Sequence, residues 1–467
     1  MVDCGVTDAP WPGDACSLVD AFRAGERSPV EELDASLAAV EASGLNAFAS
    51  LDVDRAREVA AAADVALPFG GVPLGVKELE PVAGWPATEA SLALADRTWP
   101  YSSTMVERLR GAGAVPMGAT TASEFGGLNV SVTRLHGVTR NPWDPSRTTG
   151  GSSAGSAAAV AGGLVPIATG GDGGGSIRIP AGFCGLLGMK GTYGRIPRGP
   201  RTAIQPLTVL LGCLARSVRD VSRWYDVCAG FDRRDPYSLP KVDGWERDLG
   251  TRDLAGKRAV VVPDLGSAVV RPEVADLVVA AGEQLATDAG LRLVDVPVTL
   301  PGLGTEWALT NLVQLREELG DLWPGCADDL TREIAFGLRF AEEVFDLGTA
   351  GRAEKARTEA NEAMAALFDQ VDFVIAATNP DVAFPAEVGL NTRVGDRKAG
   401  PENNGALTIP ANVVGNPAVS IPVGDVGGLP VGLQVIGRHH EDALLLDLAH
   451  VVERERPWPL VAPGAPS

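Results

Sequence analysis

Hydrophobic residues recur along the chain at two different spacings, and segments with the two spacings alternate. Residues 16–44 place apolar side chains at helical intervals, and Ser28-Pro29, followed closely by two glutamates, is typical of a helix N-terminus. Residues 72–77 are instead a short apolar run that ends at Lys77, which predicts a buried strand. The other predicted helices are residues 52–66, 102–112, 153–163, 272–289, most of 305–369 and 441–454, and the other predicted strands are 114–118, 164–169, 258–263, 292–298, 371–376 and 418–422. Such alternation is typical of an α/β protein.

The composition fits a globular protein and limits its partners. Hydrophobic residues make up 45% and charged residues 21% of the 467 residues, and no repeat or low-complexity linker divides the chain. The formal net charge of −20 would repel nucleic acid and anionic membranes. No apolar run reaches membrane-spanning length, and the opening MVDCGVTDAP lacks the features of a signal peptide. We therefore expect a cytoplasmic protein that binds neither nucleic acid nor membranes.

Cysteine and histidine give no indication of a metal or redox site. The six cysteines are scattered, and none forms a C-x-x-C pair. The four histidines include the adjacent pair His439-His440, whose side chains would point apart on any regular element. The sequence contains neither a Walker A motif nor a G-x-G-x-x-G after a strand. We expect no metal and no bound cofactor.

The most unusual segment is residues 170–176, a glycine-dense stretch that ends in Ser176. Glycine lets backbone N–H groups crowd around an anion or a developing oxyanion. A serine that follows such a stretch is a candidate nucleophile, provided that a base lies beside it. The alternative interpretation of the segment, taken alone, is a flexible surface turn.

A second segment, residues 149–156, is also rich in glycine and serine, and it opens a predicted helix. Its N–H groups could face a polar group, or its serines could simply cap the helix. Residues 151–155 also satisfy G-x-S-x-G, the nucleophile elbow of α/β-hydrolases, which would make Ser153 the nucleophile. That hypothesis needs a downstream histidine, such as His450, and leaves residues 170–175 unexplained.

Lys77 is the third candidate, because it ends an apolar strand. Partial burial at such a position would disfavour the charged amine and lower its pKa, which suits a general base. The alternative is a surface lysine that extends its ammonium group into water.

Two segments together resemble the amidase signature enzymes. GVPLGVKELE resembles the lysine segment of that family and places Lys77 as its catalytic lysine. Residues 150–191 resemble the signature itself, and Ser152 and Ser176 are separated by 24 residues, as in the family. The further matching motifs, which extend the resemblance over residues 16–458, are GLNAFASLD, TRNPWDPSRTTGGSS, GNPAVSIPVG and GLPVGLQVIGR.

The chain departs from the family pattern near these motifs. The family usually has G-T-D-T/I-G-G-S, whereas this chain has Gly171 and Gly173 at the two positions that carry side chains. Their loss leaves the backbone chemistry intact, but it would loosen the loop or open space beside the nucleophile. Glu78 stands where the family frequently has aspartate, which is a mild change.

The resemblance implies a single amidase signature domain over residues 1–467. Its fold would be a large, mixed, twisted sheet covered by helices on both faces. Within it we expect an N-terminal helical segment at 16–66, the signature core at 70–230, a substrate-side helical region at about 300–370 and a frayed tail at about 460–467.

The resemblance also implies acyl transfer by a Ser-Ser-Lys triad. Ser176 would attack the acyl carbon, Ser152, which follows a cis peptide bond in the family, would relay the proton, and neutral Lys77 would be the final base. Asp172 and Arg178 resemble a pair that braces the loop. The backbone N–H groups implied as the oxyanion hole are those of Gly173, Gly174, Gly175 and Ser176.

The implied activity is hydrolysis of C–N acyl bonds, and the family's substrates include aliphatic and aryl amides, nylon oligomers and carbamates (urethanes). The expected partner is a small-molecule amide or carbamate, and the expected assembly is a monomer or a homodimer. Apolar residues on two segments are candidates for a substrate pocket, with ordinary core packing as the alternative: Phe125, Leu128, Val130, Leu135, Trp307, Leu312 and Phe336.

Two other hypotheses share this fold. The chain could be the glutamine-hydrolysing subunit of a tRNA-dependent amidotransferase, which would need a partner and an ammonia channel. The acidic charge and the apolar residues 125–135 argue against it. The chain could also be an inactive scaffold, but the presence of Lys77, Ser152 and Ser176 together argues against that.

Overall fold

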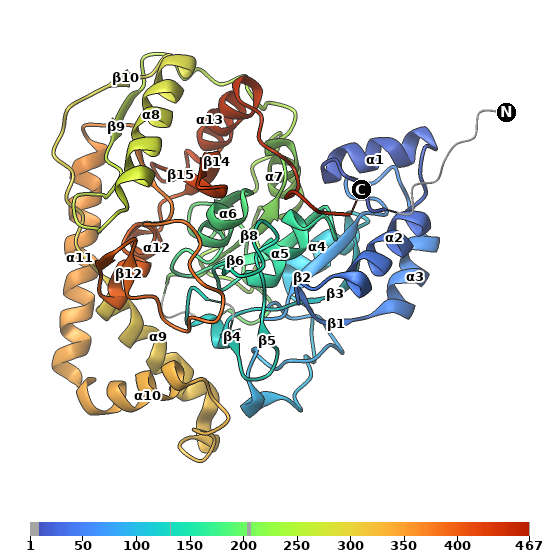
Figure 1. Ribbon diagram of the computed structural model, residues 1–467, viewed down its shortest axis with the longest axis horizontal. Coiled ribbons are helices and arrows are strands. Elements are labelled where there is room, and N and C mark those ends of the chain that lie inside the picture. Colours follow the sequence, from blue (N-terminus) through green and yellow to red (C-terminus); the bar gives the residue numbers. More distant parts are fainter. Residues whose placement is uncertain (1–8, 131, 203–206, 467) are drawn as a thin grey trace.

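Strands from both halves of the chain form one large sheet in the middle of the molecule (Figure 1). The computed structural model describes residues 9–130, 132–202 and 207–466. In chain order the strands of this sheet are β1 (Phe48–Leu51), β2 (Pro73–Lys77), β3 (Val115–Thr120), β6 (Ile167–Asp172), β7 (Leu187–Lys190), β8 (Leu210–Ala215), β9 (Arg258–Val261), β10 (Arg292–Leu293), β11 (Phe373–Ala377), β14 (Ala418–Val426) and β15 (Leu429–Gly437). Within the described residues the sheet has 11 strands, in the order β1-β3-β2-β6-β8-β7-β14-β15-β11-β9-β10. Strands β2, β3 and β6 are parallel to one another, as are β9, β10 and β11, and the remaining pairs are antiparallel.

Both faces of the sheet are covered. Every residue of β2, β3, β7, β8, β11 and β15 is buried, although alternate side chains of a strand point to opposite faces. The helices that contact the sheet include α5 (Ala154–Ala161), α6 (Arg178–Cys184), α7 (Val218–Cys228), α8 (Pro272–Ala289) and α13 (Asp442–Glu455). The predicted α/β class, with a large mixed sheet between helices, is confirmed.

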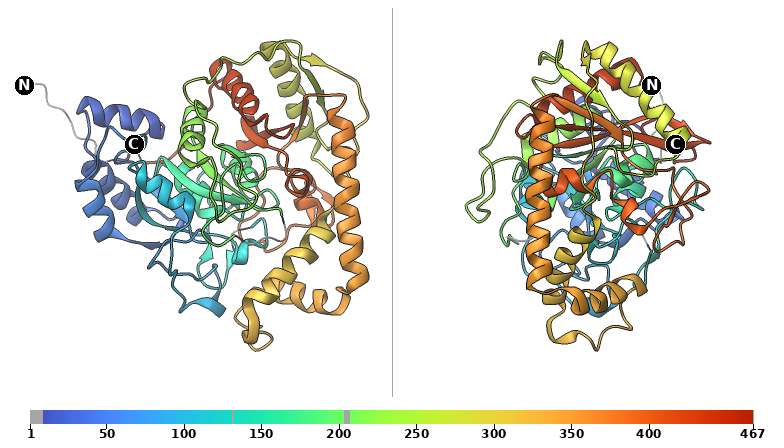
Figure 2. Two further views of the ribbon diagram at one scale, coloured as in Figure 1. Left: turned by 180° about the vertical axis from the view of Figure 1, so that it is seen from behind. Right: turned by 90° about the vertical axis from the view of Figure 1, so that its left-hand side faces the viewer.

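The N-terminal helices lie at one end of the molecule (Figures 1 and 2). They are α1 (Ala15–Ala24), α2 (Pro29–Ala42) and α3 (Val53–Ala61), and α4 (Thr104–Gly111) follows β2. The predicted helix over 16–44 is therefore two helices, because Gly25 takes a φ of 71° and ends α1. The predicted N-cap at Ser28 is confirmed, since its side chain accepts from the Glu31 N–H while the Glu31 carboxylate accepts from the Ser28 N–H.

Several helices of the C-terminal half lie at the opposite end, as Figure 2 shows. They are α9 (Gly304–Leu319), α10 (Arg332–Val344), α11 (Leu347–Phe368) and the short α12 (Ile409–Val414). In the part of the chain that the structure describes, two small hairpins lie outside the main sheet, namely β4 (Val132–Thr133) with β5 (Gly137–Val138) and β12 (Arg393–Val394) with β13 (Arg397–Lys398). The predicted helix over 272–289 is confirmed by α8, whereas the predicted strand over 292–298 is only two residues long.

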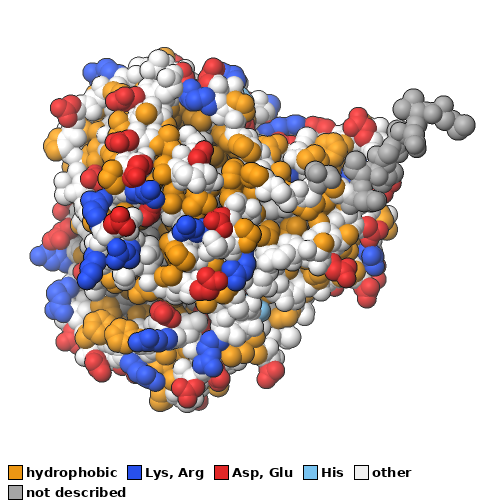
Figure 3. Space-filling model, in the orientation of Figure 1, with side chains coloured by type: hydrophobic (Ala, Val, Ile, Leu, Met, Phe, Trp, Pro, Cys, Tyr) orange, Lys and Arg blue, Asp and Glu red, His pale blue; other side chains and the backbone are white. Residues whose placement is uncertain are grey.

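Part of the C-terminal segment that the sequence predicts to be frayed is held against the rest of the protein. Ala462 is buried, and its N–H donates to Ala161 O at 2.7 Å, at the end of α5. Ser467 lies outside the described residues. So do residues 1–8, which include Cys4 and most of the opening segment. On the face drawn in Figure 3, acidic and basic side chains are interspersed, so the net charge is spread out rather than gathered in one patch there.

Candidate active site

Ser176 lies between the end of β6 and the start of α6, and it lines a cavity of about 440 Å³. The predicted loop is shorter than residues 170–175, because Gly170 and Gly171 belong to β6. Gly175 takes a φ of 124°, and a Cβ there would collide with Thr408 Oγ1, so the turn into α6 requires glycine.

Lys77 and Ser152 line the same cavity as Ser176. Lys77 is the last residue of β2, and its Nζ donates to Ser152 Oγ at 2.8 Å. The Gly151–Ser152 peptide bond is cis. Ser153, the next residue, binds the end of the glycine-rich loop, because its N–H donates to Ser176 O at 3.3 Å. Three residues that are far apart in the sequence are thus brought to one site.

The Lys77 amine is largely removed from water, since its side chain is 4% exposed. Burial lowers the pKa of Lys77 to about 8, although the negative charges of Asp172, Glu80, Glu89 and Glu78 act in the opposite direction. Its ordinary pKa is 10.5. An appreciable fraction of Lys77 is therefore neutral near neutral pH and can accept a proton.

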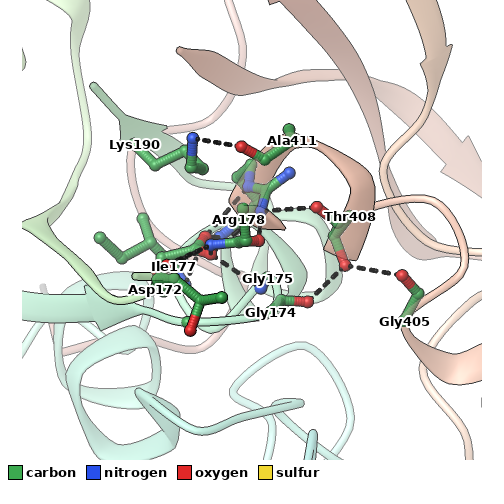
Figure 4. Close-up of polar contacts among 12 residues, drawn as sticks. Asp172, Gly174, Gly175, Ile177, Arg178, Lys190, Gly405, Thr408 and Ala411 are labelled. Carbon is green, nitrogen blue, oxygen red and sulfur yellow. Dashed lines mark hydrogen bonds and ion pairs between the residues drawn. The ribbon is translucent and has the colours of Figure 1, made fainter. Parts of the chain in front are cut away.

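Asp172 and Arg178 form a fully buried ion pair beneath the loop (Figure 4). Arg178 Nε and Nη2 each donate to the Asp172 carboxylate at 3.0 Å. Burial alone would raise the pKa of Asp172, but the charge and hydrogen bonds of Arg178, the charge of Lys190 and the hydrogen bond from Asn412 together outweigh it and hold that pKa well below its ordinary value. Arg178 also donates to Asn412 Oδ1 at 2.5 Å and to Thr408 O at 3.1 Å. These contacts join the loop to the C-terminal part of the chain.

The same network fixes the backbone of the candidate oxyanion hole. The Gly175 N–H donates to Asp172 Oδ1 at 2.7 Å, so the structure removes it from the predicted set of donors to a substrate. Thr408 Oγ1 donates to Gly174 O at 2.6 Å, and Trp307 Nε1 donates to Gly173 O at 2.7 Å. Because the peptide unit is planar, these bonds also fix the direction of the N–H on the following residue. The candidates that remain are the N–H groups of Gly173, Gly174 and Ser176.

Four of the predicted pocket residues, Phe125, Leu128, Trp307 and Leu312, line the cavity that contains Ser176. A neighbouring cavity of about 340 Å³ also contains Ser176, and Phe336 lines that one. Two other residues predicted for the pocket line neither cavity: Val130 and Leu135.

Val130 is 1% exposed and packs in a core cluster with Ile179, Phe183 and Phe384. Leu135 is half-buried, between the two strands of the β4–β5 hairpin.

Sequence reasoning missed the polar residues of the larger cavity and the residues that hold the loop. The polar residues are Glu80, Glu89, Arg198, Asn311, Gln314, Glu318 and Glu333. The loop is held by Thr408 and Asn412, which belong to a segment that carries no recognisable chemical motif. Neither set of residues recurs at a spacing along the sequence that could have identified it.

The alternative nucleophile and a metal centre both lack support in the geometry. Ser153 is fully buried and lines neither cavity, and no histidine is among the described residues that line them. Across residues 9–130, 132–202 and 207–466, no group of three or more His, Cys, Asp or Glu side chains is arranged to hold a metal ion. No helix in this part of the chain is long and apolar enough to cross a membrane.

This fold and site are those of an amide-hydrolysing class of enzyme, and comparison with known proteins identifies the family. The Amidase family model matches residues 31–446, so the chain belongs to the amidase family. The glutamyl-tRNA(Gln) amidotransferase A subunit of Synechococcus sp. (strain RCC307) is 34% identical, with 96% of this chain and 98% of that protein covered. The protein of the same name from Chloroflexus aurantiacus is also 34% identical, with 94% and 95% covered.

Solved structures of other enzymes also resemble the chain. A bacterial aryl acylamidase of the amidase signature family superposes with a TM-score of 0.88 at 28% identity, covering 96% of this chain and 97% of that one. The 6-aminohexanoate cyclic dimer hydrolase, complexed with its substrate, superposes with a TM-score of 0.86 at 27% identity, covering 97% and 99%.

Proposed function

We propose that this chain hydrolyses C–N acyl bonds by transferring the acyl group to Ser176. The observation that carries the proposal is the 2.8 Å hydrogen bond from Lys77 Nζ to Ser152 Oγ, in the cavity that Ser176 also lines. Serine is a weak nucleophile without a base, and a buried lysine with a pKa of about 8 supplies one.

In the first half of the reaction, Ser176 Oγ forms a bond to the carbonyl carbon. Its proton passes to Ser152 Oγ, whose own proton passes to neutral Lys77. The carbonyl oxygen takes up the negative charge and accepts hydrogen bonds from the N–H groups of Gly173, Gly174 or Ser176. When the C–N bond breaks, the proton on Lys77 returns through Ser152 to the nitrogen, and the amine leaves.

In the second half, a water molecule attacks the acyl-enzyme. Its proton passes through Ser152 to Lys77. When the C–O bond to Ser176 breaks, that proton returns through Ser152 to Ser176 Oγ, and the carboxylic acid leaves with Lys77 neutral again. Asp172 and Arg178 take no part in proton transfer. They keep the loop in the geometry that both halves require, because their buried pair holds the backbone on either side of Ser176.

Under this proposal we expect neutral amides, including aryl amides, as substrates. Apart from Lys77, the titratable groups that line the larger cavity are Arg198 and four carboxyl groups: Glu80, Glu89, Glu318 and Glu333. A substrate with a free carboxylate would face these groups with a single arginine to bind it. Carbamates and cyclic nylon-type oligomers present a carbonyl carbon without that charge, whereas linear nylon-type oligomers end in a carboxylate; both remain predictions.

A second candidate is the hydrolysis of glutamine as a subunit of a tRNA-dependent amidotransferase. The full-length relatives at 34% identity favour it. Glutamine carries an α-carboxylate, which the carboxyl groups of the cavity would disfavour. This candidate would bring partner subunits, whereas the first predicts a free-standing monomer or homodimer in the cytoplasm.

One experiment on the purified chain, without partners, distinguishes the two candidate functions. Release of aniline from acetanilide is compared with release of ammonia from glutamine, with a phenyl carbamate in parallel. We expect turnover of the anilide and little of glutamine. Turnover of glutamine alone would establish the second candidate.

The nucleophile is tested with two neighbouring serines. We expect Ser176→Ala to abolish turnover and fluorophosphonate labelling, and Ser153→Ala to keep most of both. Ser153 is the matched control, because the hydrogen bond that its Oγ makes among the described residues is a long one, 3.5 Å to Gly171 O. Loss of activity in Ser153→Ala, with activity retained in Ser176→Ala, would reject the proposed triad.

A further inference from the structure

Two cavities meet at Ser176, and their linings differ in character. The larger, which we call the polar arm, is lined by Lys77, Ser152 and the carboxyl-bearing residues named above, and has a volume of about 440 Å³. The smaller, which we call the apolar arm, has a volume of about 340 Å³. The residues that line only the apolar arm include the apolar Ile179, Leu309, Phe336, Phe340 and Ile409, and the polar Asn129, Thr305, Glu402 and Asn404, so its lining is predominantly rather than wholly apolar.

Resting on the proposed function, we infer that the site is built for an N-substituted amide, with its acyl group in the apolar arm and a polar amine half in the polar arm. Two arms on either side of a nucleophile suit a scissile bond that carries a substituent on each side. Each arm is of the size of a small-molecule pocket. Ammonia, the leaving group of a primary amide, would leave the polar arm almost empty.

The direction of the substrate follows from the path of the proton. The leaving nitrogen must receive a proton from Lys77 through Ser152, and both side chains line the polar arm and not the apolar arm. The nitrogen and its substituent therefore lie on that side of Ser176. The acyl group then extends the other way, between α9 and α10.

The lining of the apolar arm supports this orientation. Phe336 and Phe340 of α10 stack with ring centroids 6.3 Å apart, and they are 67% and 43% exposed. Single exposed apolar side chains are common, but two stacked rings that line one cavity form an apolar patch of the kind that marks a binding groove. An acyl chain that lies in this arm would cover part of both rings.

The lining of the polar arm favours a hydrogen-bonding amine half rather than an anionic one. Glu80 is 9% exposed, and its Oε1 has no hydrogen-bond partner among the described residues. Burial raises the pKa of Glu80 to about 7 and that of Glu89 to about 8. Near neutral pH both carboxyl groups are therefore partly protonated and can donate as well as accept.

Two glycines widen the polar arm beside the nucleophile. Gly171 and Gly173 line this arm and not the other. A Cβ on Gly171 would meet nothing closer than Leu211 Cδ2 at 3.8 Å, which is ordinary contact, whereas a Cβ on Gly173 would lie 3.1 Å from Val209 Cγ2. A methyl group at position 171 therefore fits the backbone and takes space from the polar arm.

The test uses a series of hexanoyl amides with the purified chain. We expect kcat/KM for N-(4-hydroxybutyl)hexanamide to exceed that for hexanamide at least about tenfold. Alkyl amines are poorer leaving groups than ammonia, so such a preference reports binding and not intrinsic reactivity. An equal or higher kcat/KM for hexanamide would overturn the inference.

Variants assign the two arms. Gly171→Ala should lower kcat/KM for the N-substituted amide at least about fivefold and that for hexanamide less than about twofold. Phe340→Ala should lower kcat/KM for hexanoyl amides at least about fivefold and that for acetyl amides less than about twofold, whichever amine is attached. The matched control is Gly44→Ala, where a Cβ meets nothing within 4 Å and which lines neither cavity. Equal losses on all amides would overturn the assignment.

Failure of this inference differs from failure of the proposed function. If hexanamide is hydrolysed and its N-substituted derivatives are not, the function stands and the inference fails. If no amide is hydrolysed and Ser176 is not labelled, the proposed function itself fails. If Gly171→Ala does not fold, the substrate series with the wild-type protein and the Phe340→Ala variant still test the inference.

Discussion

The pH dependence of the reaction follows from the environment of Lys77. Against an ordinary lysine with a pKa of 10.5, a pKa of about 8 raises the neutral fraction at pH 7 about 300-fold, which is equivalent to about 3 kcal/mol. About a tenth of Lys77 is neutral at pH 7 and about nine tenths at pH 9. Because only the neutral amine accepts a proton, kcat/KM for an anilide should rise about tenfold between these pH values and then level off.

The assay is kcat/KM from pH 6 to 10 at constant ionic strength. Glu80 and Glu89 titrate in the same range, with pKa values raised to about 7 and about 8, so the rise must persist in Glu80→Gln and Glu89→Gln. Lys77→Ala should lower the rate by several orders of magnitude. A flat or falling profile, a midpoint near 10.5, or a loss of tenfold or less in Lys77→Ala would refute the reasoning.

Two further predictions concern the residues that hold the loop. Asp172→Asn leaves the fully buried Arg178 without its counter-charge, so the free energy of unfolding in urea should fall by about 3–5 kcal/mol, and a loss below about 1 kcal/mol would contradict the bracing role. Trp307→Phe keeps an aromatic ring but removes the hydrogen bond to Gly173 O, so kcat should fall about fivefold, equivalent to about 1 kcal/mol, with KM nearly unchanged. The matched control is Trp323→Phe, which loses a similar bond to Glu342 outside the cavities, and an equal fall in kcat there would argue against positioning by Trp307.

The catalytic candidates could be predicted because they belong to local motifs. Lys77 ends a strand, and Ser152 and Ser176 follow glycine-rich segments whose composition is unusual by itself. The residues that fix their geometry could not be predicted in this way. Thr408 is 234 residues from the glycine whose carbonyl it binds, and Trp307 is 134 residues from its own partner. No pattern in the sequence indicates such pairs, because only the fold brings them together.

Hydrophobicity likewise predicted the fold better than the pocket. The strand signals at β2 and β11 were sufficient, since short apolar runs are typical of buried strands. The same apolar character makes Val130 and Leu135 candidates for the pocket. Because core packing and pocket lining require the same residue types, apolar character alone does not distinguish the two. The end of α1 at Gly25 was missed because the apolar spacing continues across the break.

The order of strands in the sheet has a consequence for biosynthesis. One edge of β7 pairs with β14, which the ribosome makes about 230 residues later. The ribosome adds about 5–20 residues per second, so that edge stays unpaired on the nascent chain for some tens of seconds. An open strand edge is a template for pairing with other chains, so a truncated translation product would be prone to aggregate. It would also be an inert product, because Thr408 and Asn412 emerge only near the end of synthesis.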